Sequence, residues 1–593
     1  MNFMHIITLL LLAGILFSNE PEITFADLLD HVKVLSSERF EGRKSGTRGG
    51  RKSARYIAKQ FKNFDLKPVG ENTNFKKQFK FVSDVKLGRK NKLELFHQSS
   101  TFLYQLNVDY RPLGFSQSGE IEGNLVFAGY GISADDLDYD DYTGIDVEGK
   151  VVMVLRYSPD GTNPHGKFGK YSSLRYKTMT AREKGAVGII FVTGPMDDED
   201  ETYLKSLQFD QSSAHSGIPA VMITQKRAKG ILNLVGYDLT NAQESINTSN
   251  NPFSFEMENF QVRIKTSLKL VEAKTSNVIG MIEGHDETLK NEYIVIGAHY
   301  DHLGFGEFGS LSPDDNGIHN GADDNASGVA GLLELAEWFS EHPTKRSLIF
   351  SCFGAEELGL LGSADFVKNS PVPLKNITAM INMDMIGRMT DSVLVVGGTG
   401  TSSVWEEMLN NQNNSYDLTL KFDEPGFGAS DHQSFYLKNI PVLFFFSGVH
   451  EDYHKSTDDW EKINIQGEMA TVKLIRDLVT EIGNNETPPD FQKVNSSTTS
   501  RGGFAVYLGT IPDYAATDVE GMKLSGVRDS SPADRGGLKG GDIIVEFGER
   551  NVSNIYDYMY CLQEAKAGVP VAISVKRGDE KIVLTVVPAK RKD

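Results

Sequence analysis

The second half of the chain alternates between short apolar runs and longer amphipathic stretches, and this alternation restricts the fold more than any other feature. SNVIGMIEG, EYIVIGAHYD, RSLIFSCFGAEE, NITAMINMDMIG, SVLVVGG and PVLFFFSG have the character of strands, whereas ASGVAGLLELAEWFSEH and GEMATVKLIRDLVTEIGN have that of helices. Such alternation predicts a sheet flanked by helices, with ligand sites at the carboxyl ends of the strands. We therefore expect an α/β fold over residues 269–484.

Acidic and imidazole side chains follow these strands or begin helices, where open α/β sheets place ligands. Five motifs contain them: GAHYDHLG, NGADDNASG, GAEELG, NMDMIGR and DYHKSTDDW. Each motif alone is more often structural, but all five share this placement. Nitrogen and carboxylate ligands without cysteine suit Zn²⁺ in an open, catalytic site. One bridging carboxylate would let such a set hold two metals, and a further acidic group must then accept the proton of the attacking water.

In this order the five motifs resemble those of the co-catalytic di-zinc aminopeptidase family, which includes leucyl aminopeptidases and glutamate carboxypeptidase-like metallopeptidases. The resemblance covers about residues 25–112 and 270–485. It implies a zinc-exopeptidase sheet flanked by helices (phosphorylase/hydrolase-like) and two Zn²⁺ per chain. It implies five metal ligands, which are His299, Asp324, Glu357, Asp384 and His454.

The same resemblance implies catalytic roles for neighbouring residues. Glu356 matches the general base, Asp301 the carboxylate beside the ligand His299, and Tyr453 a tyrosine that assists the oxyanion in some members. Asp324 matches the bridging ligand, and the peptide bond that follows it is often cis in this family.

The remaining polar residues of these motifs have a plainer interpretation. We expect His302 and Asp323 to support the ligands or the fold, and Asp458 to brace its loop. Arg388 could meet a substrate carboxylate or an acidic neighbour, and the sequence favours neither. A further segment resembles one near the family's substrate pocket without being predicted to bind metal, and its polar residues are Ser430, Asp431 and His432.

The rest of the chain divides by composition into further parts. Residues 19–112 are expected to be the N-terminal part of the peptidase domain, with two helical stretches joined by the glycine-rich loop FEGRKSGTRGG. Residues 113–268 contain short apolar strands, such as GKVVMVLRYSP and GAVGIIFVTGP, and resemble the β-rich protease-associated domain. The polar stretch 485–500 indicates a linker.

The C-terminal residues 501–593 resemble a bacterial PDZ domain. GVRDSSPADRGGLKGGDIIVEFGERNV closely matches such domains, and AVYLGTIPDY resembles their carboxylate-binding loop, centred on Tyr507, Leu508 and Gly509. PDZ domains bind a peptide as an added strand and hold its terminal carboxylate with backbone N–H groups. The resemblance therefore implies a C-terminal peptide as a possible ligand.

The N-terminus indicates export. Residues 6–17 form an apolar run of the length of a signal-peptide core, so we expect a signal peptide over residues 1–18 and a periplasmic or secreted bacterial protein. The run is short for a membrane span, and no stable membrane anchor is expected. Only Cys352 and Cys561 are present, which excludes a disulfide framework. The net charge of −19 argues against a nucleic-acid partner.

These observations predict a secreted or periplasmic zinc-dependent exopeptidase, foremost an aminopeptidase that acts on peptides through a metal-bridging water. A dipeptidase or glutamate-carboxypeptidase-like hydrolase is the alternative. A glutaminyl cyclase or an inactive receptor-like protein is less favoured, because the family's complete ligand set is present.

Overall fold

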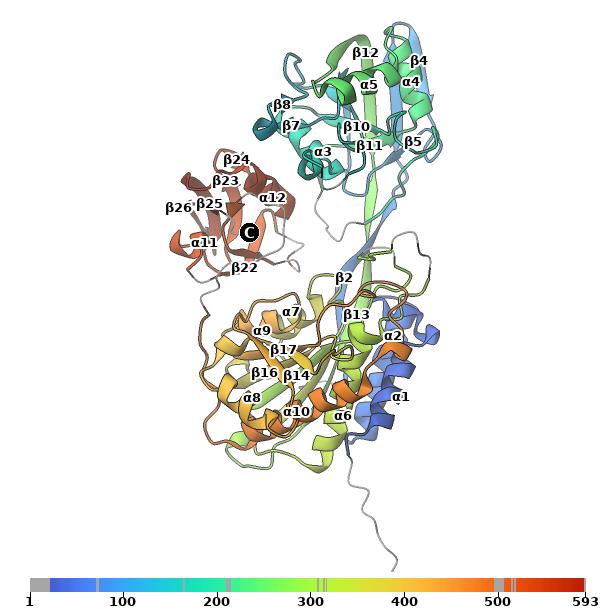
Figure 1. The fold of residues 1–593 in the computed structure, drawn as a ribbon. Helices are drawn as coiled ribbons and strands as arrows, with labels where there is room; N and C mark the ends of the chain where they lie inside the picture. Colours follow the sequence, from blue (N-terminus) through green and yellow to red (C-terminus); the bar gives the residue numbers. More distant parts are fainter. Residues whose placement is uncertain are drawn as a thin grey trace, which may run out of the picture. The chain divides into compact units, whose positions relative to one another are not determined.

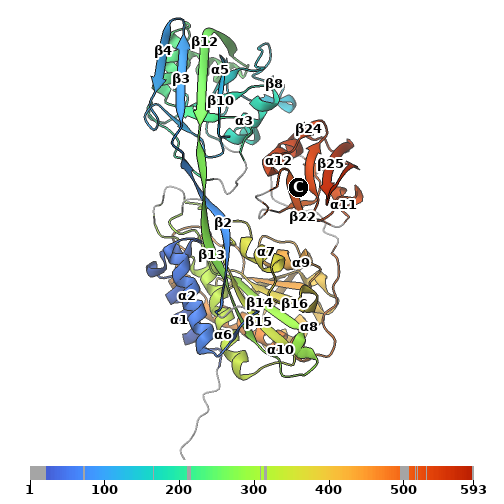
Figure 2. The same cartoon turned by 180° about the vertical axis from the view of Figure 1, so that it is seen from behind.

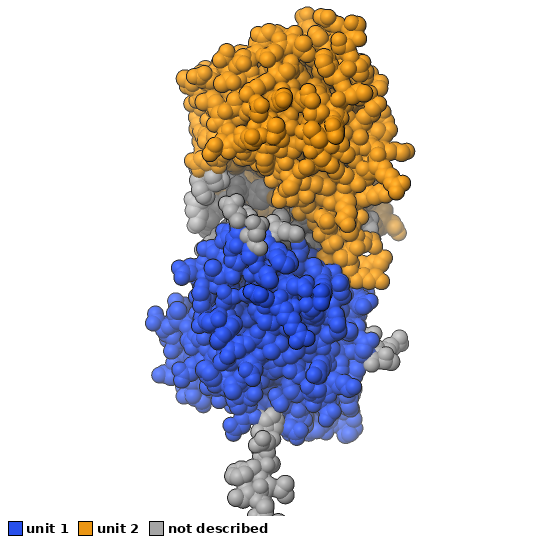
Figure 3. Space-filling view, turned by 90° about the vertical axis from the view of Figure 1, so that its right-hand side faces the viewer, with its two compact units in different colours: residues 1–79, 275–494 blue, residues 80–274, 495–593 orange. Residues whose placement is uncertain are grey.

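The structure is a computed structural model that describes residues 22–70, 74–163, 166–209, 215–306, 309–312, 315, 317–494, 506–513, 516, 519–528 and 530–590. The chain divides into two compact units, residues 1–79 with 275–494 and residues 80–274 with 495–593 (Figure 3). Within the described ranges, no helix combines the length and the apolar character that crossing a membrane requires. The expected signal peptide lies outside them.

The first unit is built on a sheet with the strand order β1-β13-β15-β14-β16-β19-β17-β18, and β2 pairs with β13. β15, β14, β16 and β19 run parallel, so their carboxyl ends meet at one edge. Its strands are β1 (Lys67–Pro68), β2 (Lys76–Leu87), β13 (Leu268–Ile282), β14 (Tyr293–His299), β15 (Ser347–Phe353), β16 (Ile377–Met383), β17 (Val393–Gly397), β18 (Thr419–Asp423) and β19 (Val442–Phe446). The α/β fold expected here is confirmed.

Helices cover both faces of this sheet. Alternate side chains of each strand point to opposite faces, so an apolar cluster forms on each face and is covered by helices. Ile294 and Ile296 of β14 join one buried apolar cluster, and Val295 joins another. The first cluster includes residues of α1 (Phe25–Leu35), α2 (Arg48–Asn63), α6 (Gly328–Glu341), α8 (Trp405–Asn413) and α10 (Ile465–Asn484). The second includes residues of α7 (Leu361–Lys368) and α9 (His432–Tyr436). Figures 1 and 2 show these helices around the sheet.

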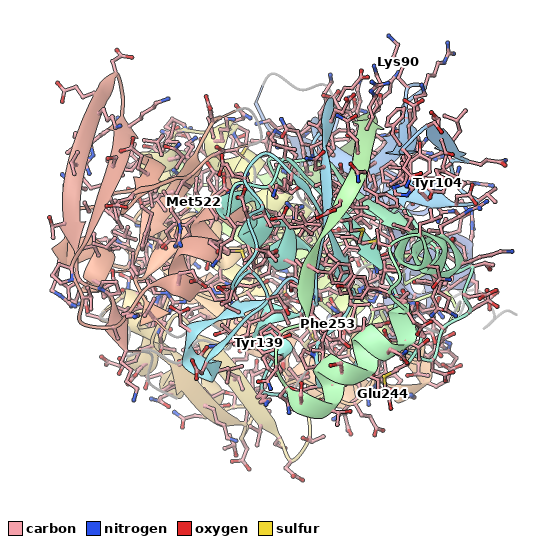
Figure 4. The ribbon with its side chains drawn as sticks, turned by 90° about the horizontal axis from the view of Figure 1, so that it is seen from above. Lys90, Tyr104, Tyr139, Glu244, Phe253 and Met522 are labelled. Atoms are coloured by element: carbon pink, nitrogen blue, oxygen red, sulfur yellow. The ribbon has the colours of Figure 1, made fainter. Side chains whose placement is uncertain are left out.

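The second unit contains an eight-stranded sheet with the order β4-β3-β12-β6-β9-β10-β11-β5. Its strands are β3 (Lys92–His97), β4 (Ser100–Tyr104), β5 (Tyr110–Pro112), β6 (Gly119–Ala128), β9 (Val151–Leu155), β10 (Gly188–Val192), β11 (Ala220–Ile223) and β12 (Ser254–Thr266). The helices that accompany this sheet are α3 (Leu174–Glu183), α4 (Gln225–Asn233) and α5 (Leu239–Ser249). Figure 4 labels Glu244 on α5 and Phe253 beside β12.

The insert begins earlier than the sequence analysis places it. Strands β3, β4 and β5 fall within the stretch expected to belong to the peptidase domain, yet β3 pairs with β12 and β5 pairs with β11 of the insert. The division between the two units accordingly lies at residues 79 and 80 rather than at 112 and 113. Pairing across such sequence distances leaves no local signal, which is why a boundary drawn from composition falls too late.

The C-terminal part of the second unit is a small β-rich fold. Its elements are β20 (Val506–Tyr507), β21 (Thr510–Pro512), β22 (Met522–Val527), α11 (Pro532–Arg535), β23 (Ile543–Phe547), β24 (Arg550–Asn551), α12 (Ile555–Glu564), β25 (Val571–Arg577), β26 (Glu580–Val586) and β27 (Ala589–Lys590). Tyr507 is the last residue of β20, and Leu508 and Gly509 connect β20 to β21. The carbonyls of Leu508 and Gly509 accept hydrogen bonds from the amides of Ala533 and Arg528.

The first residues of the predicted linker are packed on the first unit. The Asp490 carboxylate accepts hydrogen bonds from the hydroxyls of Ser402 and Ser403, and the Phe491 ring contacts Tyr436. The expected linker residues 495–500 lie outside the described residues.

Candidate metal centre and active site

The candidate site lies at the carboxyl-terminal edge of the parallel strands. His299 is the last residue of β14, Asp384 directly follows β16, and Glu356 and Glu357 follow β15 after a two-residue turn. Asp324 lies in the irregular turn Ala322–Ser327 that precedes α6. The strand order β15-β14-β16 therefore places three of the sequence motifs side by side.

Three of the predicted ligands surround one candidate metal position. His299 Nε2 lies 3.1 Å from Asp384 Oδ1 and 3.3 Å from Asp324 Oδ1. The other oxygen of Asp384, Oδ2, accepts a hydrogen bond from the Ser430 hydroxyl at 2.7 Å. Ser430 thus fixes the rotation of this carboxylate, so that Oδ1 faces the imidazole.

A second candidate position lies on the other side of Asp324. His454 Nε2 is 3.2 Å from Asp324 Oδ2 and 3.4 Å from Glu357 Oε2. His302 also approaches, with Nδ1 2.7 Å from Glu357 Oε1 and 3.7 Å from Asp324 Oδ2. The two oxygens of Asp324 therefore face different histidines, as a bridging ligand requires.

Hydrogen bonds to Asp458 fix the backbone that carries Asp324. The backbone amides of Asp323 and Asp324 both donate to Asp458 Oδ2, at 3.0 and 3.1 Å. The peptide bond between Asp324 and Asn325 is cis, as the resemblance predicts. Asp458 thus braces the turn that presents the bridging carboxylate.

The donor set fits a divalent metal such as zinc. His299 Nδ1 lies 3.2 Å from the carbonyl of Asp301, and His454 Nδ1 lies 2.9 Å from that of Gly309. A carbonyl can only accept, so each Nδ1 carries the hydrogen, and a neutral ring then directs the Nε2 lone pair at carboxylates. Lone pairs and carboxylates repel each other unless a proton or a cation lies between them. The arrangement is the one that second-sphere hydrogen bonds give to metal-binding histidines.

The electrostatics of both histidines favour a cation at Nε2. Burial opposes protonation of His299, but the carboxylates of Asp384, Glu356 and Asp324 outweigh it and raise the His299 pKa well above its usual value. Burial also opposes protonation of His454, but the carboxylates of Asp324 and Glu357 outweigh it and raise the His454 pKa to about 9. The same carboxylates would stabilise a metal ion.

Glu356 is placed to act as a base beside the first position. Its Oε2 lies 4.0 Å from His299 Nε2, and its backbone amide donates to Asp301 Oδ1 at 3.1 Å. Burial raises the Glu356 pKa well above its usual range, and the charges of Glu357 and Asp384 raise it further. A carboxylate with a raised pKa is suited to accept a proton during a reaction.

The structure assigns contacts to the other predicted residues. Asp301 meets His299 through its backbone carbonyl, whereas its carboxylate holds the Glu356 amide. The Tyr453 ring stacks on the His454 ring with centroids 3.9 Å apart. Arg388 Nη1 pairs with Asp452 Oδ2 at 3.1 Å, which favours an acidic neighbour over a substrate carboxylate. Asp323 accepts from the Gly387 amide at 2.7 Å.

The sequence analysis did not single out Arg43, yet this residue touches the turns that bear the ligands. It belongs to the glycine-rich loop, which was described only as a connection between helices. Its guanidinium donates to the carbonyls of Tyr300, Gly321 and Asp324. Its partners are far along the chain, so the sequence contains no local signal of these contacts.

Comparison with known proteins agrees with this geometry. Residues 277–479 match peptidase family M28. Residues 121–231 match the PA domain and residues 495–587 match a PDZ domain. The resemblances to the co-catalytic zinc aminopeptidases, to the protease-associated domain and to PDZ domains are therefore confirmed.

The chain is similar to several curated proteins. Leupeptin-inactivating enzyme 1 of Streptomyces exfoliatus is 37% identical over 146 residues, which are 24% of this chain and 32% of that protein. Aminopeptidase YwaD of Bacillus subtilis is 32% identical over 238 residues, which are 37% of this chain and 48% of that protein. The chain thus spans between about a third and about a half of these relatives. The solved aminopeptidase from Aneurinibacillus sp. strain AM-1 aligns over 81% of this chain and 98% of its own, with 22% identity and a TM-score of 0.48.

Proposed function

We propose that this protein is a zinc-dependent exopeptidase, foremost an aminopeptidase, in which Asp324 would serve as a ligand to each of two zinc ions. One observation carries the proposal: the two oxygens of Asp324 face His299 Nε2 at 3.3 Å and His454 Nε2 at 3.2 Å, with the Glu356 carboxylate beside the first histidine. His299 and Asp384 would complete one metal position, and Glu357 and His454 the other.

The residues of the chain have separable tasks in peptide hydrolysis. Bound zinc ions supply Lewis acidity, which polarises the scissile carbonyl and lowers the pKa of water. Glu356 accepts the proton of the attacking water on its carboxylate and delivers it to the nitrogen of the leaving amine. Asp301 holds the Glu356 backbone, and Ser430 holds Asp384. These contacts keep base and ligands at fixed distances, which general-base catalysis requires.

The choice of an aminopeptidase rests on similarity. The relative from Bacillus subtilis is named an aminopeptidase. A dipeptidase or glutamate-carboxypeptidase-like hydrolase would use the same metal site and remains the alternative. A glutaminyl cyclase and an inactive receptor are less favoured, because the geometry brings together a complete ligand set and a base.

Substrates that differ in one blocked end test this choice. Purified protein is assayed on aminoacyl-nitroanilides, on their N-acetylated forms and on carboxyl-blocked dipeptides, before chelation, after it, and after zinc is restored. An aminopeptidase cleaves only substrates with a free amino end and loses and regains activity with the metal. Cleavage of N-acetylated peptides with a free carboxyl end would indicate a carboxypeptidase. Cyclisation of N-terminal glutamine would indicate a cyclase, and zinc binding without turnover would indicate a receptor.

We further propose export and peptide binding for the remaining parts. The apolar run 6–17 supports a cleaved signal peptide and a periplasmic or secreted location. The PDZ domain supports recognition of a peptide with a free C-terminal carboxylate through the loop Tyr507–Leu508–Gly509. N-terminal sequencing of protein from cell fractions tests the first point. Binding of peptides with free and amidated C-termini tests the second.

A further inference from the structure

Arg43 is buried at the base of the metal centre, although it comes from the N-terminal part of the chain. It ends the turn Glu38–Arg43 between α1 and α2, and 1% of its surface is exposed. A guanidinium group has five N–H donors and no acceptor, and it stays charged even when buried. Such a group is costly to bury unless its donors are satisfied.

Within the described part of the chain, Arg43 donates five hydrogen bonds, and all of them go to backbone carbonyls. Nε donates to Tyr300 at 3.0 Å. Nη1 donates to Leu35 at 3.0 Å and to Asn320 at 2.5 Å, and Nη2 donates to Gly321 at 2.8 Å and to Asp324 at 3.2 Å. One planar group therefore joins the end of α1 to two segments of the metal centre.

These segments are the ones that carry ligands. Tyr300 directly follows the ligand His299, and residues 320–324 form the approach to the bridging Asp324. Arg43 lies 257 residues before Tyr300 and 281 residues before Asp324 in the sequence. Its contacts with both turns therefore depend on the tertiary fold. Arg43 thus fixes the distance between the backbone that holds His299 and the backbone that holds Asp324.

The neighbours of Arg43 contact the same turns. The Gly42 carbonyl accepts a hydrogen bond from the Gly304 amide at 3.0 Å. Gly42 has φ of +61°, and a Cβ there would lie 2.5 Å from the Gly304 oxygen, so only glycine allows this approach. Ser45 Oγ accepts from the Ala355 amide at 2.8 Å, directly before Glu356.

We propose that the segment Gly42–Ser45, through Arg43, is a positioning element that sets the geometry of the metal centre by holding the turns after β14 and β15 and the turn before α6. This inference rests on the proposed zinc site. It predicts that Arg43 and Ser45 affect metal binding beyond their effect on the stability of the fold.

The chain offers a matched control for Arg43. Arg346 is also fully buried in the same unit and also donates to backbone carbonyls, to Ile482 at 2.9 Å, to Asn485 and to Glu486 at 3.2 Å, besides pairing with Glu292. It lies directly before the first residue of β15, at the end of the strand opposite the glutamates. Arg346 therefore also holds backbone segments together through its guanidinium, but those segments do not carry the predicted metal ligands.

The test compares Arg43→Lys with Arg346→Lys. Lysine keeps the charge but lacks the planar fork, so both variants should unfold at a lower temperature. Zinc affinity is measured by competition with a chromogenic chelator, and the Co²⁺-substituted proteins are compared by visible absorption. We expect about 10–100-fold weaker zinc binding and an altered Co²⁺ spectrum for Arg43→Lys alone. Equal zinc affinities and equal spectra in the two variants would overturn the inference.

A milder pair keeps the test decisive if Arg43→Lys does not fold. Ser45→Ala removes the acceptor of the Ala355 amide, and Ser347→Ala removes the acceptor of the Gly284 amide, which Ser347 Oγ binds at 2.9 Å away from the ligands. We expect about fivefold weaker zinc binding for Ser45→Ala and unchanged zinc binding for Ser347→Ala. Equal affinities in this pair would also overturn the inference. Wild-type protein that binds no zinc would instead refute the proposed metal site, and this inference with it.

Discussion

The large sheet of the first unit and the eight-stranded sheet of the insert both have buried titratable side chains nearby, but the two clusters differ in how those groups are paired. In the insert, Asp141 accepts hydrogen bonds from the amides of Tyr130 and Ile132, each at 3.0 Å, and from the hydroxyl of Tyr139, labelled in Figure 4, at 2.8 Å. Lys177 donates to the carbonyls of Leu155 and Tyr157. Donors thus meet acceptors, and the insert cluster is complete by itself.

The cluster at the sheet edge of the first unit is arranged in the opposite way. Carboxylates of Asp324, Glu357 and Asp384 converge on imidazoles whose Nδ1 atoms already face carbonyl oxygens. Within the described part of the chain, Asp301 Oδ2 and His302 Nε2 have no hydrogen-bond partner. Burial alone therefore does not distinguish a functional cluster. The excess of converging acceptors does, because only a cation can satisfy it.

The largest expected effect separates catalysis from burial. Glu356→Gln removes the proton acceptor but keeps the shape of the side chain, so turnover should fall by about 10²–10⁴-fold. Zinc content by elemental analysis should not change. Asp141→Asn alters a carboxylate that is fully buried in the insert and should leave turnover unchanged. Normal turnover in Glu356→Gln would exclude this residue as the base.

Removal of the bridging carboxylate tests the metal pair. Asp324→Ala takes one ligand from each of the two positions, so zinc affinity should fall by more than about 100-fold, beyond the effect of a supporting residue. Elemental analysis after dialysis should find fewer than two zinc ions per chain. Two full equivalents in this variant would exclude the bridge.

His302 should have an intermediate effect on metal binding. Its Nδ1 lies at hydrogen-bond distance from Glu357 Oε1, whereas His454 faces Oε2. His302→Leu removes this contact and should weaken zinc binding by about 10–100-fold. His302→Asn can place an amide donor near the position of Nδ1 and should restore most of the affinity. Equal losses in both variants would indicate that the ring nitrogen itself binds the metal.

The smallest effect is expected in the insert and concerns stability alone. Burial lowers the pKa of Lys177 to about 7, although Asp141 opposes the shift. The unfolded chain keeps this proton up to its ordinary pKa near 10.5, so the unfolded state binds more protons above pH 7. The contribution of Lys177 to stability should therefore rise between pH 7 and pH 9, by at most about 1.4 kcal/mol per pH unit.

Lys177→Met should remove this contribution to the dependence of stability on pH without changing turnover. Thermal unfolding of both proteins at pH 7 and pH 9, with peptidase assays alongside, measures the difference. An unchanged slope would show that Lys177 keeps its proton when folded. Lost turnover with intact folding would contradict the contrast between the two clusters.

Much of the architecture could be anticipated from the sequence, because its signals are local. Apolar runs that are buried along nearly their whole length define β14, β15 and β16, and acidic or imidazole residues lie at or directly after the end of each. The boundary of the insert could not be anticipated, since β3 and β5 find their partners more than 100 residues away. Arg388 illustrates the same limit, because its pairing with Asp452 depends on a fold that the sequence does not show.

The sequence by itself determined the resemblances to three kinds of domain and which residue types stand at the ends of the strands, because each motif is a short, contiguous pattern. Only the tertiary structure decided how those residues face one another: Asp324 with an oxygen toward each of two histidines, Asp301 meeting His299 through its backbone, and Arg43 tying together turns that lie more than 250 residues beyond it. The physical reason is that hydrogen bonds and charges act over a few ångströms. Their partners are set by the packing of the sheet and its helices and not by proximity along the chain.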